Sequence, residues 1–128
     1  MIQQQLIFVY NANGDLFSTV TDFAHKILSP STYDCHLCAL TYGNFSEKEE
    51  WRSFIKSFDI KTSIIYKDEF VKQYKNQAEL PAIFMQSENQ LQQIISKGEI
   101  GQCRSIDELK NLILIKHKEY VQHHHTNI

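Results

Sequence analysis

Short apolar runs alternate along this chain with segments whose apolar residues recur at helical spacing. The runs predict strands, because a strand that is covered on both faces needs no polar alternation. They lie at Leu6–Tyr10, Leu37–Tyr42, Ile60–Tyr66, Ala82–Met85 and Leu91–Ile95. The helical spacing predicts helices at Leu16–Leu28, from Ser46 to Phe58, at Asp68–Tyr74 and from Ser105 onward.

Polar residues and a proline mark where several of these elements begin and end. Ser46 and Ser105 each precede a glutamate by three positions, which is the spacing of a helix capping box. The first helix should stop before Ser29-Pro30, because the residue before a proline disfavours helical backbone angles. The polar segment Gln86–Gln90 predicts a hairpin turn that pairs the last two strands antiparallel.

The order of these elements resembles the thioredoxin fold. The buried strand Leu6–Tyr10 is followed by a turn and a helix, Leu80-Pro81 directly precedes the strand Ala82–Met85, and a hairpin leads to a final helix at Ser105. Alternating strands and helices predict crossover connections and a largely parallel sheet, to which the hairpin adds an antiparallel edge. The resemblance implies an α/β three-layer sandwich with a mixed sheet, helices on both faces, and a cis-proline at Pro81 that faces the active-site loop.

Length and composition limit the class of protein. A chain of 128 residues, 42% of them hydrophobic, has the size and core material of one domain. We assign the domain to residues 1–118 and expect residues 119–128 to form a polar, flexible tail. The formal net charge of −2 offers no basic footprint for nucleic acid, and no apolar stretch approaches the ~20 residues of a membrane span. We therefore expect the protein to bind neither nucleic acid nor a membrane. Without a visible signal peptide, we also expect a cytoplasmic protein with reduced thiols.

The segment Cys35-His36-Leu37-Cys38 is the main candidate for chemistry. Two thiols at this spacing are typical of redox centres and of metal sites, and His36 could tune a neighbouring thiol or act as a third ligand. The alternative is that Cys38 is an ordinary core residue and that Cys35 is a loop residue without a functional role. We expect no cofactor, and zinc is the alternative, since a zinc site would need further ligands from Cys103 or the histidines.

The position of this cysteine pair departs from the family that the chain resembles. In thioredoxins the dithiol lies between the first strand and the first helix of the core, but here Asn11–Asp15 follows the first strand and holds no cysteine. With Leu37–Tyr42 as a strand, the pair would lie at the end of the sheet away from Pro81. A second alignment places Cys35 in the active loop and requires a helix from Cys35 onward. The prediction of a strand at Leu37–Tyr42 ranks this second alignment lower.

A second candidate site is the loop that follows the first strand. Asn11, Asn13 and Gly14 lie where a strand ends and a helix begins, the place where open α/β sheets bind ligands, and Pro81 would lie nearby. The alternative is a plain Asn-Gly turn. Two functions therefore stay open. One is thiol redox or metal handling at Cys35 and Cys38 with a protein or small thiol partner, and the other is a non-catalytic binding module with its ligand at this loop.

Overall fold

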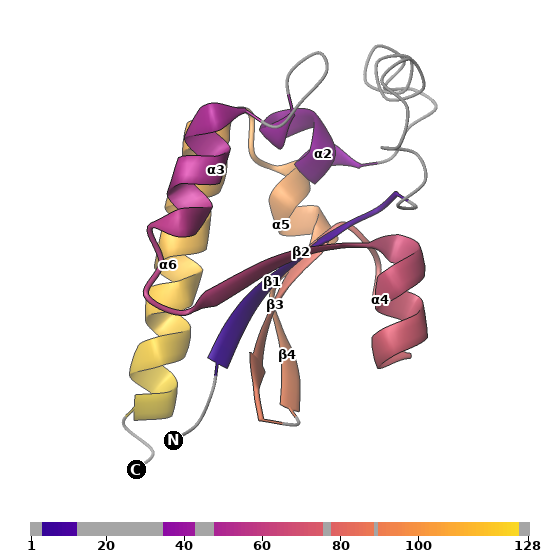
Figure 1. Cartoon of the computed structure of the whole chain (residues 1–128). Helices are drawn as coiled ribbons and strands as arrows, with labels where there is room; N and C mark the ends of the chain where they lie inside the picture. Colours follow the sequence, from indigo (N-terminus) through magenta and orange to yellow (C-terminus); the bar gives the residue numbers. More distant parts are fainter. Residues whose placement is uncertain (1–3, 13–34, 43–47, 76–77, 89, 126–128) are drawn as a thin grey trace.

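Four strands form one mixed sheet at the centre of the molecule. The computed structural model describes residues 4–12, 35–42, 48–75, 78–88 and 90–125. The strands are β1 (Gln4–Tyr10), β2 (Lys61–Tyr66), β3 (Ala82–Ser87) and β4 (Gln90–Ile95). They stand in the order β2-β1-β3-β4 (Figure 1), with β1 parallel to β2 and antiparallel to β3, and with β3 antiparallel to β4.

The pairing register brings three strand termini together. Val9 of β1 lies opposite Ile65 of β2 on one side and opposite Ala82 of β3 on the other. The last residues of β1 and β2 and the first residue of β3 therefore share one end of the sheet. We call it the Tyr10 end, after the last residue of β1.

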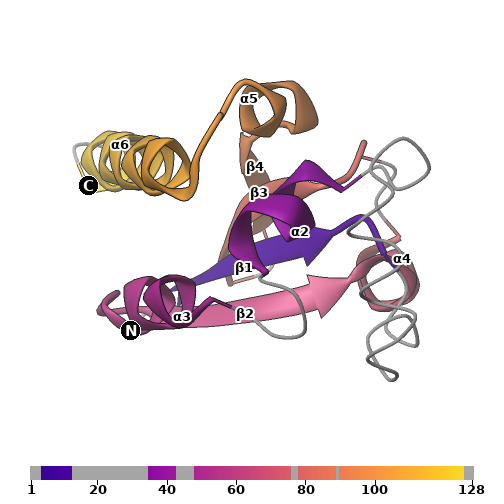
Figure 2. The ribbon, with the colours of Figure 1, turned by 90° about the horizontal axis from the view of Figure 1, so that it is seen from above.

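Helices lie on both faces of this sheet (Figures 1 and 2). One face carries α2 (His36–Thr41), α3 (Glu49–Lys56), α5 (Lys97–Gly101) and α6 (Ile106–His125), and the other face carries α4 (Lys67–Tyr74). The alternation of β1 explains this division, because successive side chains of a strand point to opposite faces. Leu6, Phe8 and Tyr10 join the larger core cluster, whereas Ile7 and Val9 join the smaller one under α4.

Aromatic and aliphatic residues hold α3 and α6 against the sheet. The ring of Trp51 is fully buried and meets Phe8 of β1 edge to face, with ring centroids 5.2 Å apart. Leu109 and Ile113 of α6 are also fully buried in the larger cluster. Burial of one such side chain contributes about 1.5–3 kcal/mol. The two helices are joined by an ion pair from Lys110 to Glu50, at 3.6 Å.

Most predicted elements are confirmed, and the differences have identifiable causes. Strands at β1 to β4 and helices at α3, α4 and α6 occur where the pattern predicts them. The predicted Ser46 cap lies outside the described residues, and α3 instead begins after Lys48, which makes no side-chain cap. The helix predicted at Leu16–Leu28 also lies outside the described residues. The sheet is mixed rather than largely parallel, because β1 pairs antiparallel with β3.

The prediction of a strand at Leu37–Tyr42 is wrong, because this segment forms α2. A short apolar run that is buried all round does not distinguish strand from helix by its periodicity. Four of the six residues of α2 are buried, and the side chain of Cys35 caps the helix by accepting a hydrogen bond from the backbone N–H of Cys38.

The C-terminal region holds more helix than the sequence suggested. The short helix α5 was not predicted, and it begins at a capping box formed by Ser96 and Glu99. The expected cap of the last helix is confirmed by the hydrogen bond from the Glu108 N–H to Ser105 Oγ, 3.2 Å long. That helix runs to His125, beyond the predicted domain boundary, because Tyr120 is buried in the larger cluster.

Candidate functional site

Cys35 and Cys38 form a disulfide at the start of α2. Their Cα atoms lie 5.3 Å apart, within the range that a disulfide requires. On an extended strand the same two residues would be ~10 Å apart. The helical turn at Cys35 is therefore what brings the two sulfurs together.

This disulfide lies at the Tyr10 end of the sheet, beside the beginning of β3. The backbone N–H of Asn11, directly after β1, donates to Cys35 Sγ at 3.3 Å. Pro81 directly precedes β3 at the same end, and its peptide bond with Leu80 is cis. The prediction that the pair lies at the end away from Pro81 is therefore wrong. It followed from the wrong strand assignment. The helix that the second alignment required after Cys35 is present, while the strand that it also required before Ser29-Pro30-Ser31 falls outside the described residues.

The sulfur of Cys35 accepts hydrogen bonds from two backbone amides. One comes from Asn11 and the other from Cys38, each with a nitrogen–sulfur distance of 3.3 Å. Donors that point at a sulfur stabilise its negatively charged form once the disulfide is reduced. Because Cys35 accepts both, its sulfur is well placed to become a thiolate.

A chain of hydrogen bonds anchors α2 on the end of β1. The Oγ1 of Thr41 donates to the carbonyl of Leu37 at 2.8 Å, so the hydroxyl of buried Tyr10 donates to Thr41 Oγ1 at 2.9 Å. The carbonyl of Thr41 in turn accepts from the N–H of Lys48, which leads into α3. These contacts fix the helix, and therefore Cys35, relative to the strand.

His36 links α2 to the segment that follows α5. Its Nε2 lies 2.6 Å from the backbone carbonyl of Cys103, and because a carbonyl only accepts, Nε2 carries the proton. That nitrogen is therefore engaged as a donor and is not placed to bind a metal. Cys103 is a buried free thiol, and burial raises its pKa, with the charge of Glu108 adding to the effect.

Both bonded cysteines are covered in this oxidised form. Cys35 is 2% exposed, and Cys38 is 0% exposed within the larger core cluster. In thiol–disulfide exchange, the incoming thiolate has to reach the sulfur atom that it attacks. Exchange at Cys35 therefore requires a movement that uncovers it.

An open pocket of about 400 Å³ lies at the Tyr10 end of the sheet, and Asn11 and Leu80 are among its lining residues. Asn11, whose amide holds Cys35 Sγ, forms part of its wall, and so does Leu80, directly before Pro81. Asn11, the first residue of the loop that the sequence singled out, thus lies at a pocket, whereas Asn13 and Gly14 are outside the described residues. The remaining lining residues come from distant parts of the chain: Lys67, Val71, Ala78, Glu79 and Lys97.

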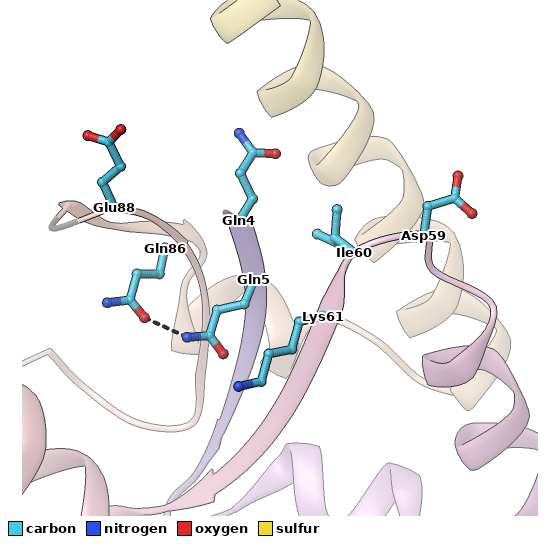
Figure 3. Close-up of a pocket in the computed structure, with 7 residues that line it drawn as sticks. All are labelled: Gln4, Gln5, Asp59, Ile60, Lys61, Gln86 and Glu88. Carbon is cyan, nitrogen blue, oxygen red and sulfur yellow. Dashed lines mark hydrogen bonds between the residues drawn. The ribbon is translucent and has the colours of Figure 1, made fainter. Parts of the chain in front are cut away.

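A second pocket, of about 540 Å³, lies at the other end of the sheet, where β1 and β2 begin and β3 ends. Figure 3 shows the residues that line it. Two glutamines from neighbouring strands are joined there by a hydrogen bond of 2.7 Å from Gln5 Nε2 to Gln86 Oε1. Ser63 donates to Gln5 and Tyr74 donates to Gln86, so the amide oxygens are also engaged. No local motif marks this pocket in the sequence, because it forms where the starts of β1 and β2 meet the turn between β3 and β4.

The described residues show no metal-binding cluster, and comparisons with known proteins find no match. Among the described residues, no three His, Cys, Asp or Glu side chains gather closely enough to hold a metal ion. The same part of the chain contains no helix that is long and apolar enough to cross a membrane. No family model, no curated protein and no solved structure matches the chain.

Proposed function

We propose that this protein is a thiol–disulfide redox protein with a thioredoxin-like, three-layer fold, in which Cys35 and Cys38 are the reacting pair. The strand order β2-β1-β3-β4, with only β1 and β2 parallel, supports this fold. The cis peptide before Pro81 agrees with what the resemblance implied. The observation that carries the proposal is the disulfide itself, formed at a helix start beside the end of β1.

The reduced pair would transfer two electrons to a substrate disulfide. The Cys35 thiolate attacks one substrate sulfur, the substrate S–S bond breaks, and one substrate thiolate leaves. Cys38 then loses its proton and attacks Cys35 Sγ, which releases the second substrate thiolate and restores the Cys35–Cys38 bond. The substrate gains two electrons and two protons, and a dithiol reductant returns the protein to its starting state.

The geometry assigns different roles to the two cysteines. Cys35 accepts both backbone hydrogen bonds, which favours its thiolate as the attacking group. Cys38 is fully buried and lies one helical turn later, which suits a resolving thiol that acts only on its neighbour. A reducing compartment such as the cytoplasm suits this cycle, because thiol reductants are present there.

The second candidate function is a non-catalytic binding module in which the disulfide only fastens α2. The burial of both sulfurs favours this alternative. The pocket beside Asn11 and Leu80 would then hold the ligand. Both functions use the Tyr10 end of the sheet, so an experiment that only locates a ligand there cannot separate them. The experiment has to test whether Cys35 and Cys38 react with a disulfide.

A trapping experiment separates the two functions. In a Cys103→Ala background, reduced Cys38→Ser protein is mixed with a small neutral disulfide, and Cys35→Ser protein serves as the matched control. We expect Cys38→Ser to accumulate a stable mixed disulfide at Cys35, visible by mass spectrometry. Cys35→Ser should accumulate far less, because it lacks the sulfur whose thiolate the two backbone hydrogen bonds favour. Equal labelling of the two variants, or none in either, would favour the binding module.

A further inference from the structure

The pocket at the Tyr10 end has charged walls that suit an anionic ligand. Among the described residues, its charged lining residues are Lys67, Lys97 and Glu79, of which two are positive and one is negative. Its volume of about 400 Å³ falls within the range of small-molecule sites. Asn11 lines the pocket, and its backbone N–H donates a hydrogen bond to Cys35 Sγ.

The two lysines occupy positions that their helices do not favour. Lys67 is the first residue of α4 and Lys97 is the first residue of α5. A positive charge at the start of a helix opposes the helix dipole, and acidic residues are preferred there. Local helix stability therefore does not explain why both helices begin with lysine on the wall of one pocket.

An exposed apolar residue of the same wall points to a ligand with an aliphatic part. Val71 is 50% exposed, and it lines the pocket together with Leu80 and Ala78. The pocket thus joins a hydrophobic surface to two ammonium groups. This combination fits a short aliphatic chain that ends in a carboxylate.

We propose that the pocket selects small disulfides that carry carboxylate groups, with Lys67 and Lys97 binding the carboxylates while the substrate sulfur reaches Cys35. This inference rests on the proposed redox function and adds its substrate class. The chemical step is the two-electron exchange given above, in which the reduced Cys35–Cys38 pair becomes a disulfide and the substrate becomes two thiols.

Three small disulfides that differ in charge test this selectivity. Reduced Cys103→Ala protein is mixed with dithiodiglycolate, which is anionic, with bis-hydroxyethyl disulfide, which is neutral, and with cystamine, which is cationic. Each rate is divided by the rate of the same disulfide with a free dithiol, which removes intrinsic reactivity. We expect the anionic compound to react fastest and the cationic compound slowest.

Charge-removing variants then locate the cause of the preference. Lys67→Gln and Lys97→Gln should each lower the corrected rate with dithiodiglycolate about three- to tenfold, the size of one charge interaction across solvent. Their rates with the neutral disulfide should stay within about twofold. Lys61→Gln is the matched control, because it removes the same charge at the opposite pocket. Its rates should be unchanged with all three compounds.

The outcomes distinguish the two proposals. If the neutral disulfide reacts but the anionic one has no advantage, or if Lys61→Gln lowers the anionic rate as much as the pocket variants do, the substrate class is wrong and the redox function stands. If none of the three disulfides oxidises the Cys35–Cys38 pair, the redox function fails, and the substrate class fails with it.

Discussion

Reduction of the disulfide is expected to cost little stability and to leave the fold intact. The bond joins residues three positions apart, so it closes a very small loop. In the chain-entropy model, closing a loop of about four residues raises the free energy of the unfolded state by only about 2 kcal/mol. The free energy of unfolding should therefore fall by about 2 kcal/mol when Cys35 and Cys38 are reduced.

Other contacts hold α2 in place without the bond. Leu37 and Leu40 are buried in the larger cluster, and each contributes about 1.5–3 kcal/mol. The hydrogen bond from Tyr10 to Thr41 adds about 1 kcal/mol. Together these contacts exceed the contribution of the disulfide, so the reduced helix should stay docked on β1.

Urea denaturation of oxidised and reduced protein measures this difference without changing a side chain. The Cys103→Ala background leaves Cys35 and Cys38 as the sole thiols, and the single, buried Trp51 reports unfolding by its fluorescence. We expect cooperative transitions of equal denaturant dependence whose midpoints differ by the equivalent of about 2 kcal/mol. A loss above about 4 kcal/mol, or a reduced protein without a cooperative transition, would show that the disulfide is a structural cross-link.

Three further predictions concern the framework around the site. Thr41→Val should lower the free energy of unfolding by about 1–2 kcal/mol in urea, since it removes two buried hydrogen bonds, and Tyr10→Phe should cost about 1 kcal/mol, since it removes one of them. Burial lowers the pKa of His117, so the unfolded chain binds a proton at a higher pH than the folded one. Stability should therefore decline as the pH falls below about 6.5, and the difference between wild type and His117→Gln should shrink in acid; a pH-independent difference would rule out this titration. Leu109→Ala should cost about 2–5 kcal/mol and Leu114→Ala about 0.5 kcal/mol or less, because the first side chain is 0% exposed and the second is 49% exposed; equal losses would contradict the orientation of α6.

The pattern of apolar residues predicted most of the fold, and it failed where burial removes the pattern. A short, continuous apolar run fits a buried strand and a buried helical segment equally well, so Leu37–Tyr42 could not be assigned by periodicity. The capping spacing that marked Ser105 is also present at Ser96 and Glu99, and it could have revealed α5. The continuation of the last helix was similarly readable, because Ile113 and Tyr120 keep its apolar spacing.

The candidate site was only half predictable. The spacing of Cys35 and Cys38 indicated paired chemistry, but the location of the pair depended on one wrong strand. The positively charged pocket had no local signal at all, because Asn11, Lys67 and Lys97 lie far apart in the sequence and meet only through the topology of the sheet. Such a constellation can be recognised only once the strand order is known.

The most direct test of the redox function is an equilibrium titration of the Cys35–Cys38 pair. Cys103→Ala protein is equilibrated in thiol–disulfide buffers of graded potential, and its thiols are blocked by alkylation and counted by mass spectrometry. We expect a reversible two-electron transition with a midpoint above about −300 mV, in the range of catalytic disulfides. A pair that stays oxidised down to potentials below this value, as structural disulfides do, would contradict the proposed function.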